Sequence, residues 1–252
     1  MLSAISKLAE INTDRSLPVF SVQDNPKAVA MKIRKELYPD FNSVQKEFLR
    51  ALISKFAEKN ILVFEFVETW NKKEKANIDG FFLAPNVIVL KRQQSAFRRE
   101  IFTLIHELGH YLLNEEEIEQ LEISNFANNK LSAIERWCYD FAYYFLAGEY
   151  NKAFEQIDEA DGTNDYHFEL IENISKHTHL SQIALYTNLL YQKKISQNNY
   201  NKIRAEFDEE YRQRQEEKEK QKELDKMLGI QKGGSTPKPI NSPLLISTIQ
   251  TA

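Results

Sequence analysis

Two of the five histidines, His106 and His110, lie four residues apart, with Glu107 beside the first, in the stretch FTLIHELGHYLL. On an α-helix, side chains at this spacing project from one face with Cβ atoms about 5 to 6 Å apart, so both imidazoles could bind one ion. Zinc binds imidazole nitrogen at about 2.0 to 2.1 Å, and a catalytic zinc takes three protein ligands and leaves one position for water. The spacing therefore predicts a metal site with His106 and His110 as two ligands.

Glu107 gives this site its predicted chemistry. The H-E-x-x-H pattern is typical of metalloproteases, in which the glutamate lies too far round the helix to bind the metal easily but can reach the attacking water. Its expected role is general base: it takes a proton from the water and passes it to the leaving amine. The alternative is an ordinary amphipathic helix that happens to carry histidine, since leucines and isoleucine anchor the same helix.

The third ligand must come from another part of the chain, because no third histidine follows at short spacing. Glu135 is our preferred ligand: it shares a helical stripe with the small residues Cys138 and Ala142, which would let its helix approach closely after one loop and an antiparallel return. The acidic run Glu115 to Glu117 is a competitor, although it adjoins the end of the same helix and is expected to face water. Cys138 could be a soft ligand, but a buried free cysteine usually serves packing.

Two further features bear on catalysis. Gly109 inside the metal helix costs roughly 1 kcal/mol relative to alanine, which either substrate room or close helix packing would explain. A peptidase also needs a donor for the oxyanion of the tetrahedral intermediate. The candidates are Tyr139, Tyr143, His167, His177 and His179. For His177 and His179, in the stretch SKHTHLS, a solvated position near a helix end is favoured.

Composition limits the classes of protein. The formal net charge is −4, with Lys+Arg 33 and Asp+Glu 37 interspersed along the 252 residues, so no global electrostatic attraction to nucleic acid or anionic lipid is expected. A single cysteine excludes an internal disulfide and fits a reducing compartment. The amino terminus carries charges that interrupt any signal-peptide core, and no stretch is long enough to span a bilayer. A cytoplasmic protein without a membrane partner is expected.

The hydrophobic pattern predicts mostly helices with a small sheet. Helices are expected from Pro26, from about Asn42, over about 96–114 and 131–147, then over roughly 166–176 and 180–192. The run Ile61 to Val67 is expected to form a strand, and a hairpin should turn at Pro85 and Asn86. The expected organisation is a lead-in at 1–25, a core at 26–150, a helical C-terminal region at 151–210, a charged helix at 211–228 and a flexible tail at 229–252.

The motifs resemble a known family. The segment IDGFFLAPNVIVLKRQQSAFRREIFTLIHELGHYLL followed by ERWCYDFAYYFL is similar to the ImmA/IrrE family of zinc metallopeptidases, in which a hairpin leads into an R-x-x-F-T-x-x-H-E-x-x-H helix and an E-x-x-A-x-x-F-A helix. The matching positions are Arg99, Phe102, Thr103, His106, Glu107, His110, Glu135, Phe141 and Ala142. Cys138 stands where alanine is usual, Tyr139 where asparagine is usual, and Asn188 where arginine is frequent.

The resemblance implies a fold and an activity. It implies an α+β, mostly helical fold with a zincin-like metallopeptidase core, a small β-sheet and additional C-terminal helices. It also implies one Zn²⁺ ion held by His106, His110 and Glu135, with Glu107 as catalytic base. The implied substrate is a partner protein, a helix-turn-helix transcriptional repressor encoded nearby, whose cleavage acts in stress, mobile-element or toxin-antitoxin regulation. Direct nucleic-acid binding by this chain is not expected.

Two other hypotheses remain at the level of sequence. One is an antitoxin-like or anti-repressor binding module that sequesters a partner without cleaving it, for which the charged helix and the tail would suit docking. The other is DNA binding through the region 180–203, where four basic residues lie close together: Lys193, Lys194, Lys202 and Arg204. Without an aromatic platform, such residues are more often a solvated face.

Overall fold

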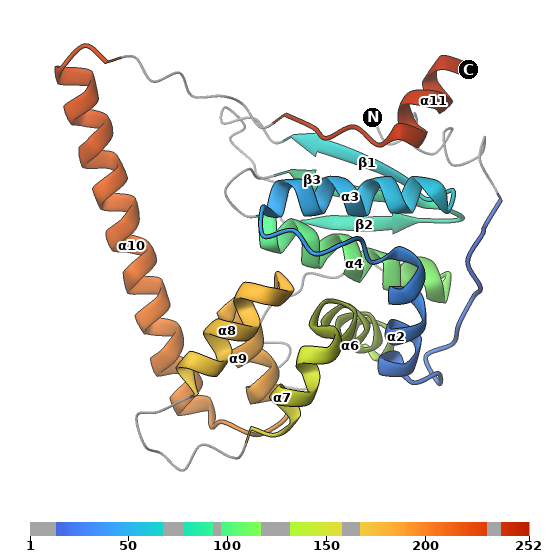
Figure 1. The fold of residues 1–252 in the computed structure, drawn as a ribbon, viewed down its shortest axis with the longest axis horizontal. Coiled ribbons are helices and arrows are strands. Elements are labelled where there is room, and N and C mark those ends of the chain that lie inside the picture. Colours follow the sequence, from blue (N-terminus) through green and yellow to red (C-terminus); the bar gives the residue numbers. More distant parts are fainter. Residues whose placement is uncertain are drawn as a thin grey trace.

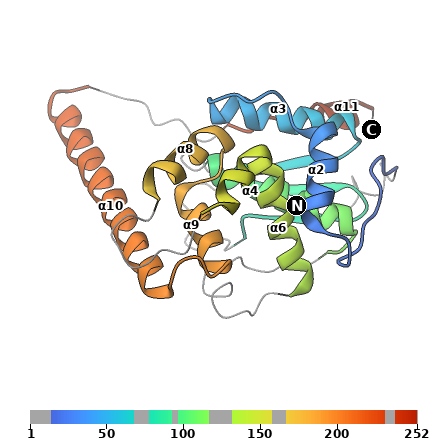
Figure 2. The same cartoon turned by 60° about the horizontal axis from the view of Figure 1, so that its bottom comes forward.

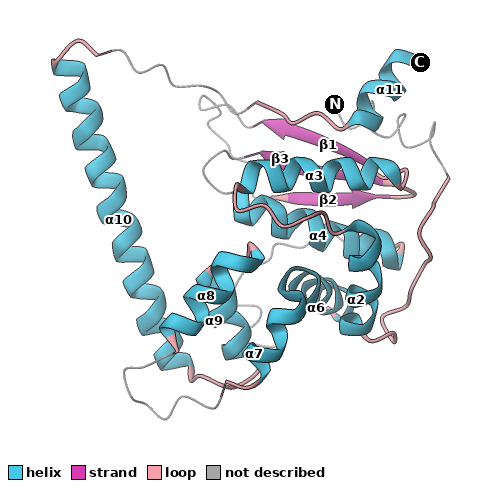
Figure 3. Cartoon of the chain, viewed as in Figure 1, coloured by secondary structure: helices cyan, strands magenta, loops and turns pink. Residues whose placement is uncertain are grey.

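The computed structural model describes residues 14–67, 78–92, 97–116, 132–157, 167–230 and 238–251. In these ranges the chain is mostly helical with one three-stranded sheet (Figure 3), which confirms the α+β prediction. None of the helices in these ranges combines the length and the apolar character that crossing a lipid bilayer requires.

The first two helices begin and end close to where the sequence predicts. Helix α2 spans Pro26–Leu37, and the Asn25 side chain caps it by accepting from the backbone N–H of Ala28 at 3.0 Å. Helix α3 spans Gln45–Glu58 and buries an apolar face, Phe48, Leu49, Leu52, Ile53 and Phe56. Val44 precedes the first helical turn and is 56% exposed, so the helix begins three residues later than Asn42.

The sheet combines a predicted hairpin with an unpredicted pairing. Strands β2 (Gly80–Leu83) and β3 (Val87–Arg92) form the expected antiparallel hairpin. Strand β1 (Leu62–Val67) adds to the other side of β3 in parallel, so the order is β1-β3-β2. β3 is thus the central strand, and all of its residues are buried.

Helices α4 (Phe97–Leu113) and α6 (Ala133–Ala147) form the layer beside the sheet (Figure 1). α4 packs on β2 and β3, and α6 packs on α4 and α2. Gly109 permits the contact between them, because a Cβ built there would lie 3.0 Å from the Cα, Cβ and Sγ atoms of Cys138. Of the two explanations offered for this glycine, the structure supports close helix packing.

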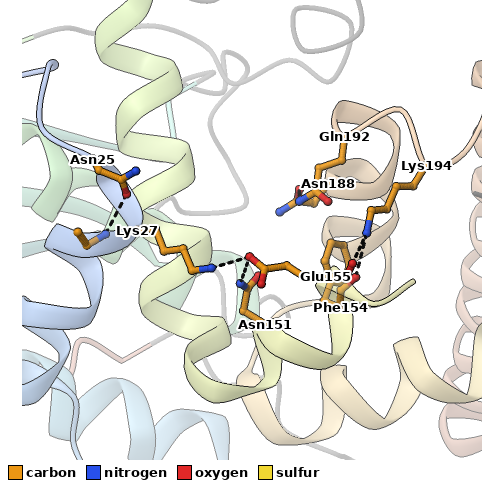
Figure 4. A network of polar contacts seen from close by, with 9 residues as sticks. Asn25, Lys27, Asn151, Phe154, Glu155, Asn188, Gln192 and Lys194 are labelled. Atoms are coloured by element: carbon orange, nitrogen blue, oxygen red, sulfur yellow. Dashed lines mark hydrogen bonds and ion pairs between the residues drawn. The ribbon is translucent and has the colours of Figure 1, made fainter. Parts of the chain in front are cut away.

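The C-terminal helical region shares the main hydrophobic core, through residues such as Ile171 and Leu185, and is also joined to it by polar contacts. The 3₁₀ turn η1 (Gly148–Tyr150) and helix α7 (Asn151–Glu155) follow α6, and Gly148 ends α6 with a positive φ of 52°. Glu155 accepts from Lys27 at 2.5 Å, and its backbone carbonyl accepts from Lys194 at 2.8 Å (Figure 4). These contacts link the start of α2, helix α7 and the turn that follows helix α9 (Gln182–Tyr191).

Three more helices complete this region, and the last is longer than expected. They are α8 (Phe168–Thr178), α9 (Gln182–Tyr191) and α10 (Gln197–Met227). The predicted boundary between 210 and 211 falls inside α10, which continues through it because no Gly or Pro interrupts the segment and pairs such as Arg212 with Glu209 and Glu216 support it. Both views show α10 extending away from the core (Figures 1 and 2).

The tail differs from the expected flexible segment. Residues Pro243–Thr251 form helix α11, which contacts β1 and α3. Glu65 of β1 accepts from the backbone N–H groups of Ile240 at 3.0 Å and Asn241 at 2.7 Å. In addition, Leu244 and Leu245 pack on the apolar outer face of the sheet. These tertiary contacts hold the described part of the tail, residues 238–251, whereas residues 231–237 of the predicted flexible tail lie outside the described residues.

The described part of the lead-in is also more specific than its sequence suggests. Leu17 is buried in the main core, and the backbone N–H of Phe20 donates to the carbonyl of Leu112 at 2.8 Å. Residues 14–25, called the N-terminal strap below, are therefore held along the end of α4 by these contacts.

The α4–α6 contact predicts the effect of adding one methyl group. Gly109→Ala should gain about 1 kcal/mol of helix propensity, but the new Cβ would meet the Cys138 backbone at 3.0 Å, and backbone atoms cannot rotate away. We therefore expect a net loss of about 1 to 3 kcal/mol in the free energy of unfolding, measured by urea denaturation. Cys138→Ala, which removes an atom from the same contact, should cost less. A Gly109→Ala protein as stable as the wild type would contradict this account.

His179, at the end of α8, predicts a pH dependence of stability. Its ring is buried against Phe41 and Phe48, with ring centroids 4.9 and 4.2 Å away, and burial together with the charge of Arg98 lowers its pKa to about 4. In the unfolded chain the pKa of histidine is about 6.5. The histidine therefore contributes no pH dependence above about 6.5, and the folded state loses stability as the pH falls from there towards 4, because only the unfolded state takes up the proton.

The variant His179→Asn tests this assignment, since asparagine tolerates the positive φ of 59° at this position and does not titrate. Urea midpoints at pH 7.5 and pH 5 should differ less for the variant than for the wild type. Equal differences would show that other groups carry the acid sensitivity.

Candidate metal centre

Three buried side chains from two helices converge at one point. His106 and His110 lie on α4, and Glu135 lies in the first turn of α6, where the Ser132 side chain caps the helix by accepting from the Glu135 N–H at 3.1 Å. The Glu135 carboxylate places Oε2 3.1 Å from His106 Nε2 and Oε1 3.1 Å from His110 Nε2. One ligand atom from each residue lies within 4.8 Å of the other two. This cluster could hold a metal ion.

The donor atoms fit a divalent metal. The Nε2 atoms of His106 and His110 face each other at 3.2 Å, although at most one of two neutral rings can donate across such a contact. The other ring nitrogen of His110, Nδ1, lies 3.2 Å from the carbonyl oxygen of Glu115. If Nδ1 donates there, Nε2 keeps a lone pair directed into the cluster, which is the arrangement common among metal-ligating histidines.

Electrostatics favour the metal-binding forms of Glu135 and His106, whereas, against the effect of burial, contact with the Glu135 carboxylate raises the pKa of His110. Burial tends to raise the pKa of the Glu135 carboxyl, but hydrogen bonds from the two histidines outweigh it and lower that pKa to about 2. Burial also lowers the pKa of His106. A carboxylate and a neutral imidazole are the forms that bind metal.

Glu107 lies beside the cluster and outside it. Its side chain is buried and accepts a hydrogen bond from the backbone N–H of Phe82 on β2, and its Oε2 has no hydrogen-bond partner in the described part of the chain. Burial raises its pKa to about 8. The glycine at position 80 makes room for this arrangement, since a Cβ there would lie 2.7 Å from Thr103 and 3.3 Å from Glu107. No motif in the sequence points to Gly80 or Phe82 as part of the site, although a glycine within the hairpin was an available signal.

The alternative ligands lie elsewhere. Cys138 packs its Sγ against Gly109 at the helix contact. Glu115 and Glu116 are exposed, and the Glu116 carboxylate accepts from the backbone N–H of Ala84 at 2.5 Å. Glu117 is outside the described residues. The structure therefore brings Glu135 to the two histidines and does not bring Cys138, Glu115 or Glu116.

The proposed oxyanion donors have different surroundings. Tyr139 lies one helical turn after Glu135, is buried, and places its ring 5.3 Å from that of Phe102. It therefore lies next to the cluster along both helices. Tyr143 lies a further turn along α6, where its ring contacts those of Tyr144 and Phe154.

The three histidines proposed as donors have contacts on other elements. His177 contacts the Asn173 carbonyl at 2.8 Å and stacks on Tyr150. His179 is buried between two phenylalanine rings instead of forming the expected solvated end. His167 precedes α8 with a left-handed backbone. Of the proposed donors, Tyr139 is therefore the one that lies beside the cluster of His106, His110 and Glu135.

Comparison with known proteins agrees with this reading of the cluster. The family model described as the IrrE N-terminal-like domain, a peptidase domain, matches residues 55–181, which is half of the chain and includes the three cluster residues and Glu107. No curated protein and no solved structure matches the chain. The match begins in α3 and ends at the start of α9, so it covers the sheet, the metal helix and the helix that carries Glu135. The chain belongs to the ImmA/IrrE family of peptidases.

Proposed function

We propose that the protein is a zinc-dependent endopeptidase that cleaves a partner protein. The observation that carries the proposal is the buried triangle of His106, His110 and Glu135, with the Glu107 carboxylate beside it and outside it. Two imidazoles and one carboxylate are a ligand set that suits zinc at a hydrolytic site.

In this proposal the metal and the glutamate divide the chemistry. A bound zinc ion would supply a Lewis acid that polarises the scissile carbonyl and activates water. Glu107 takes the proton from the attacking water and delivers it to the leaving amine. Its Oε2 is available for this transfer, since it has no hydrogen-bond partner among the described residues. The Phe82 N–H holds the carboxylate in position during both transfers.

The sheet suggests how a polypeptide substrate would approach. Within the described residues, β2 pairs with β3 on one side only, and its Phe82 N–H points to Glu107 on the other. An extended peptide that displaces the Glu116 carboxylate from the Ala84 N–H could add to this edge through main-chain hydrogen bonds and pass the catalytic glutamate in both directions. Such binding suits an endopeptidase, because the substrate can continue beyond the site at both ends.

The partner we propose is a helix-turn-helix transcriptional repressor, cleaved in stress, mobile-element or toxin-antitoxin regulation. Support comes from the family to which the chain belongs. The competing proposal is a module that sequesters such a partner without cleavage. It is favoured by one observation, the long exposed surface of α10 outside the matched domain.

Zinc binding is the first test. Zinc at 100 times its dissociation constant should stabilise the wild-type protein by about 2.7 kcal/mol, measured as an increase in the free energy of unfolding. Glu135→Gln should remove most of this increase, because an amide is a poorer zinc ligand than a carboxylate. Asp140→Asn, on the same helix but outside the cluster, is the matched control and should keep it. If zinc stabilised Glu135→Gln as much as it stabilises the wild type, the ion would have to bind elsewhere.

Cleavage is the second test. Glu107→Gln should retain zinc but lose cleavage by about 10² to 10⁴-fold, the range expected for a general base, and can serve to trap the partner from host cells. The captured partner, incubated with wild-type protein and zinc, should give two fragments whose intact masses sum to the partner plus one water. Cleavage by Glu107→Gln at the wild-type rate would refute the mechanism, whereas a partner that stays bound and intact with the zinc-loaded wild type would favour sequestration.

A further inference from the structure

The end of the metal helix forms a specific capping turn. Asn114 follows α4 with a left-handed φ of 56°, and its N–H donates to the Tyr111 carbonyl at 3.1 Å. The N–H of Glu115 then donates to the His110 carbonyl at 3.1 Å. This pair of hydrogen bonds is a Schellman motif, which satisfies carbonyls that the helix end leaves without partners.

This turn also determines the environment of a metal-cluster histidine. His110 contacts Glu115 twice, because its backbone carbonyl accepts the Glu115 N–H and its Nδ1 lies 3.2 Å from the Glu115 carbonyl oxygen. The orientation of the His110 ring therefore depends on the turn keeping its shape. Contacts of this kind to the second ring nitrogen fix the tautomer and the direction of a ligating histidine.

Arg15 holds the turn from outside. Its guanidinium donates to the Tyr111 carbonyl, to Asn114 Oδ1 at 3.2 Å and to the Pro85 carbonyl at 2.5 Å. The guanidinium carbon also lies 3.8 Å from the centroid of the Tyr111 ring. One side chain thus connects the last turn of α4, the left-handed residue after it and the β2–β3 turn.

The acceptors explain why an arginine suits this position. The three hydrogen-bond acceptors are two carbonyls and one amide oxygen, so the contact depends on directed donors more than on pairing of opposite charges. Guanidinium presents its donors in a rigid planar fork and stacks on aromatic rings, whereas the lysine ammonium is a point charge on a flexible stem. Either side chain would place a positive charge near the C-terminus of α4, which the helix dipole favours.

We propose that Arg15 is a positioning residue of the metal centre, which locks the turn after α4 so that the Glu115 carbonyl stays on His110 Nδ1. The inference rests on the proposed metal binding at the cluster. It extends the functional unit beyond the matched domain, because Arg15 lies forty residues before residue 55, where the match begins.

The test is the zinc dissociation constant of Arg15 variants, measured by competition with a chromophoric chelator. Loss of a contact that orients a ligating histidine weakens metal affinity by about 10 to 100-fold, and we expect a loss in this range for Arg15→Ala. Arg15→Lys keeps the charge but not the fork and should remain close to Arg15→Ala. Ser16→Ala is the matched control: Ser16 Oγ donates to the Lys59 carbonyl, so this variant loosens the same strap without touching α4.

A second readout needs no metal. Hydrogen–deuterium exchange of the metal-free protein should show faster exchange at the Asn114 and Glu115 amides in Arg15→Ala and Arg15→Lys, with unchanged protection in the middle of α4. Exchange and zinc affinity should both stay at wild-type values in Ser16→Ala. If Arg15→Ala fails to fold, the comparison of Arg15→Lys with Ser16→Ala carries the test.

The outcomes separate this inference from the proposed function. A wild-type protein without measurable zinc binding would overturn the proposed function and this inference with it. Zinc binding by the wild type with equal affinity in Arg15→Ala would overturn only the role of Arg15. Full recovery of affinity in Arg15→Lys would also overturn it, since the positive charge at the helix end would then account for the whole effect.

Discussion

The close approach of α4 and α6 is the constraint on which the candidate site depends. Glu135 reaches His106 and His110 only because Gly109 and Cys138 let the two helix backbones come together. A buried carboxylate is costly unless hydrogen bonds or charges compensate it, and hydrogen bonds from the two imidazoles supply this compensation. Packing and electrostatics therefore favour the same arrangement, since the contact that buries Glu135 also supplies its partners.

A second layer of contacts surrounds the cluster and comes from several parts of the chain. The hairpin provides the Phe82 N–H that holds Glu107, and the turn after α4 provides the Glu115 carbonyl beside His110. Both are backbone groups, so their positions depend on the path of the chain more than on residue type. This explains why the N-terminal strap, which binds the end of α4 and the hairpin turn, can influence a site to which it contributes no ligand.

Both terminal segments are held against the core by tertiary contacts. Residues 14–25 lie against the end of α4 near the β2–β3 turn, and residues 238–251 lie against β1. On β1, the buried Glu65 accepts from the C-terminal backbone and also pairs with Arg92, which pairs in turn with Glu100 of α4 at 2.9 Å. A buried cation between two carboxylates thus connects the C-terminal segment to the metal helix.

Local patterns in the amino-acid sequence predict most of the helices and strands and the two candidate histidine ligands. Capping residues, turn residues and the hydrophobic period act locally, so they predict the hairpin and the helices that begin near Pro26, Phe97 and Ala133. The facing positions of His106 and His110 follow from helix geometry alone. Glu107 as a non-ligand beside them follows from the same geometry.

Only the tertiary structure decided which distant groups meet. Spacing left Glu115, Glu116 and Cys138 as competitors of Glu135, and the packing of α6 on α4 brought Glu135 to the histidines. Other features also join residues far apart in the chain. They are the parallel pairing of β1, the burial of His179, the order of α11 and the three hydrogen bonds of Arg15. No local pattern encodes such contacts, because each depends on where a second element lies once the common core has formed.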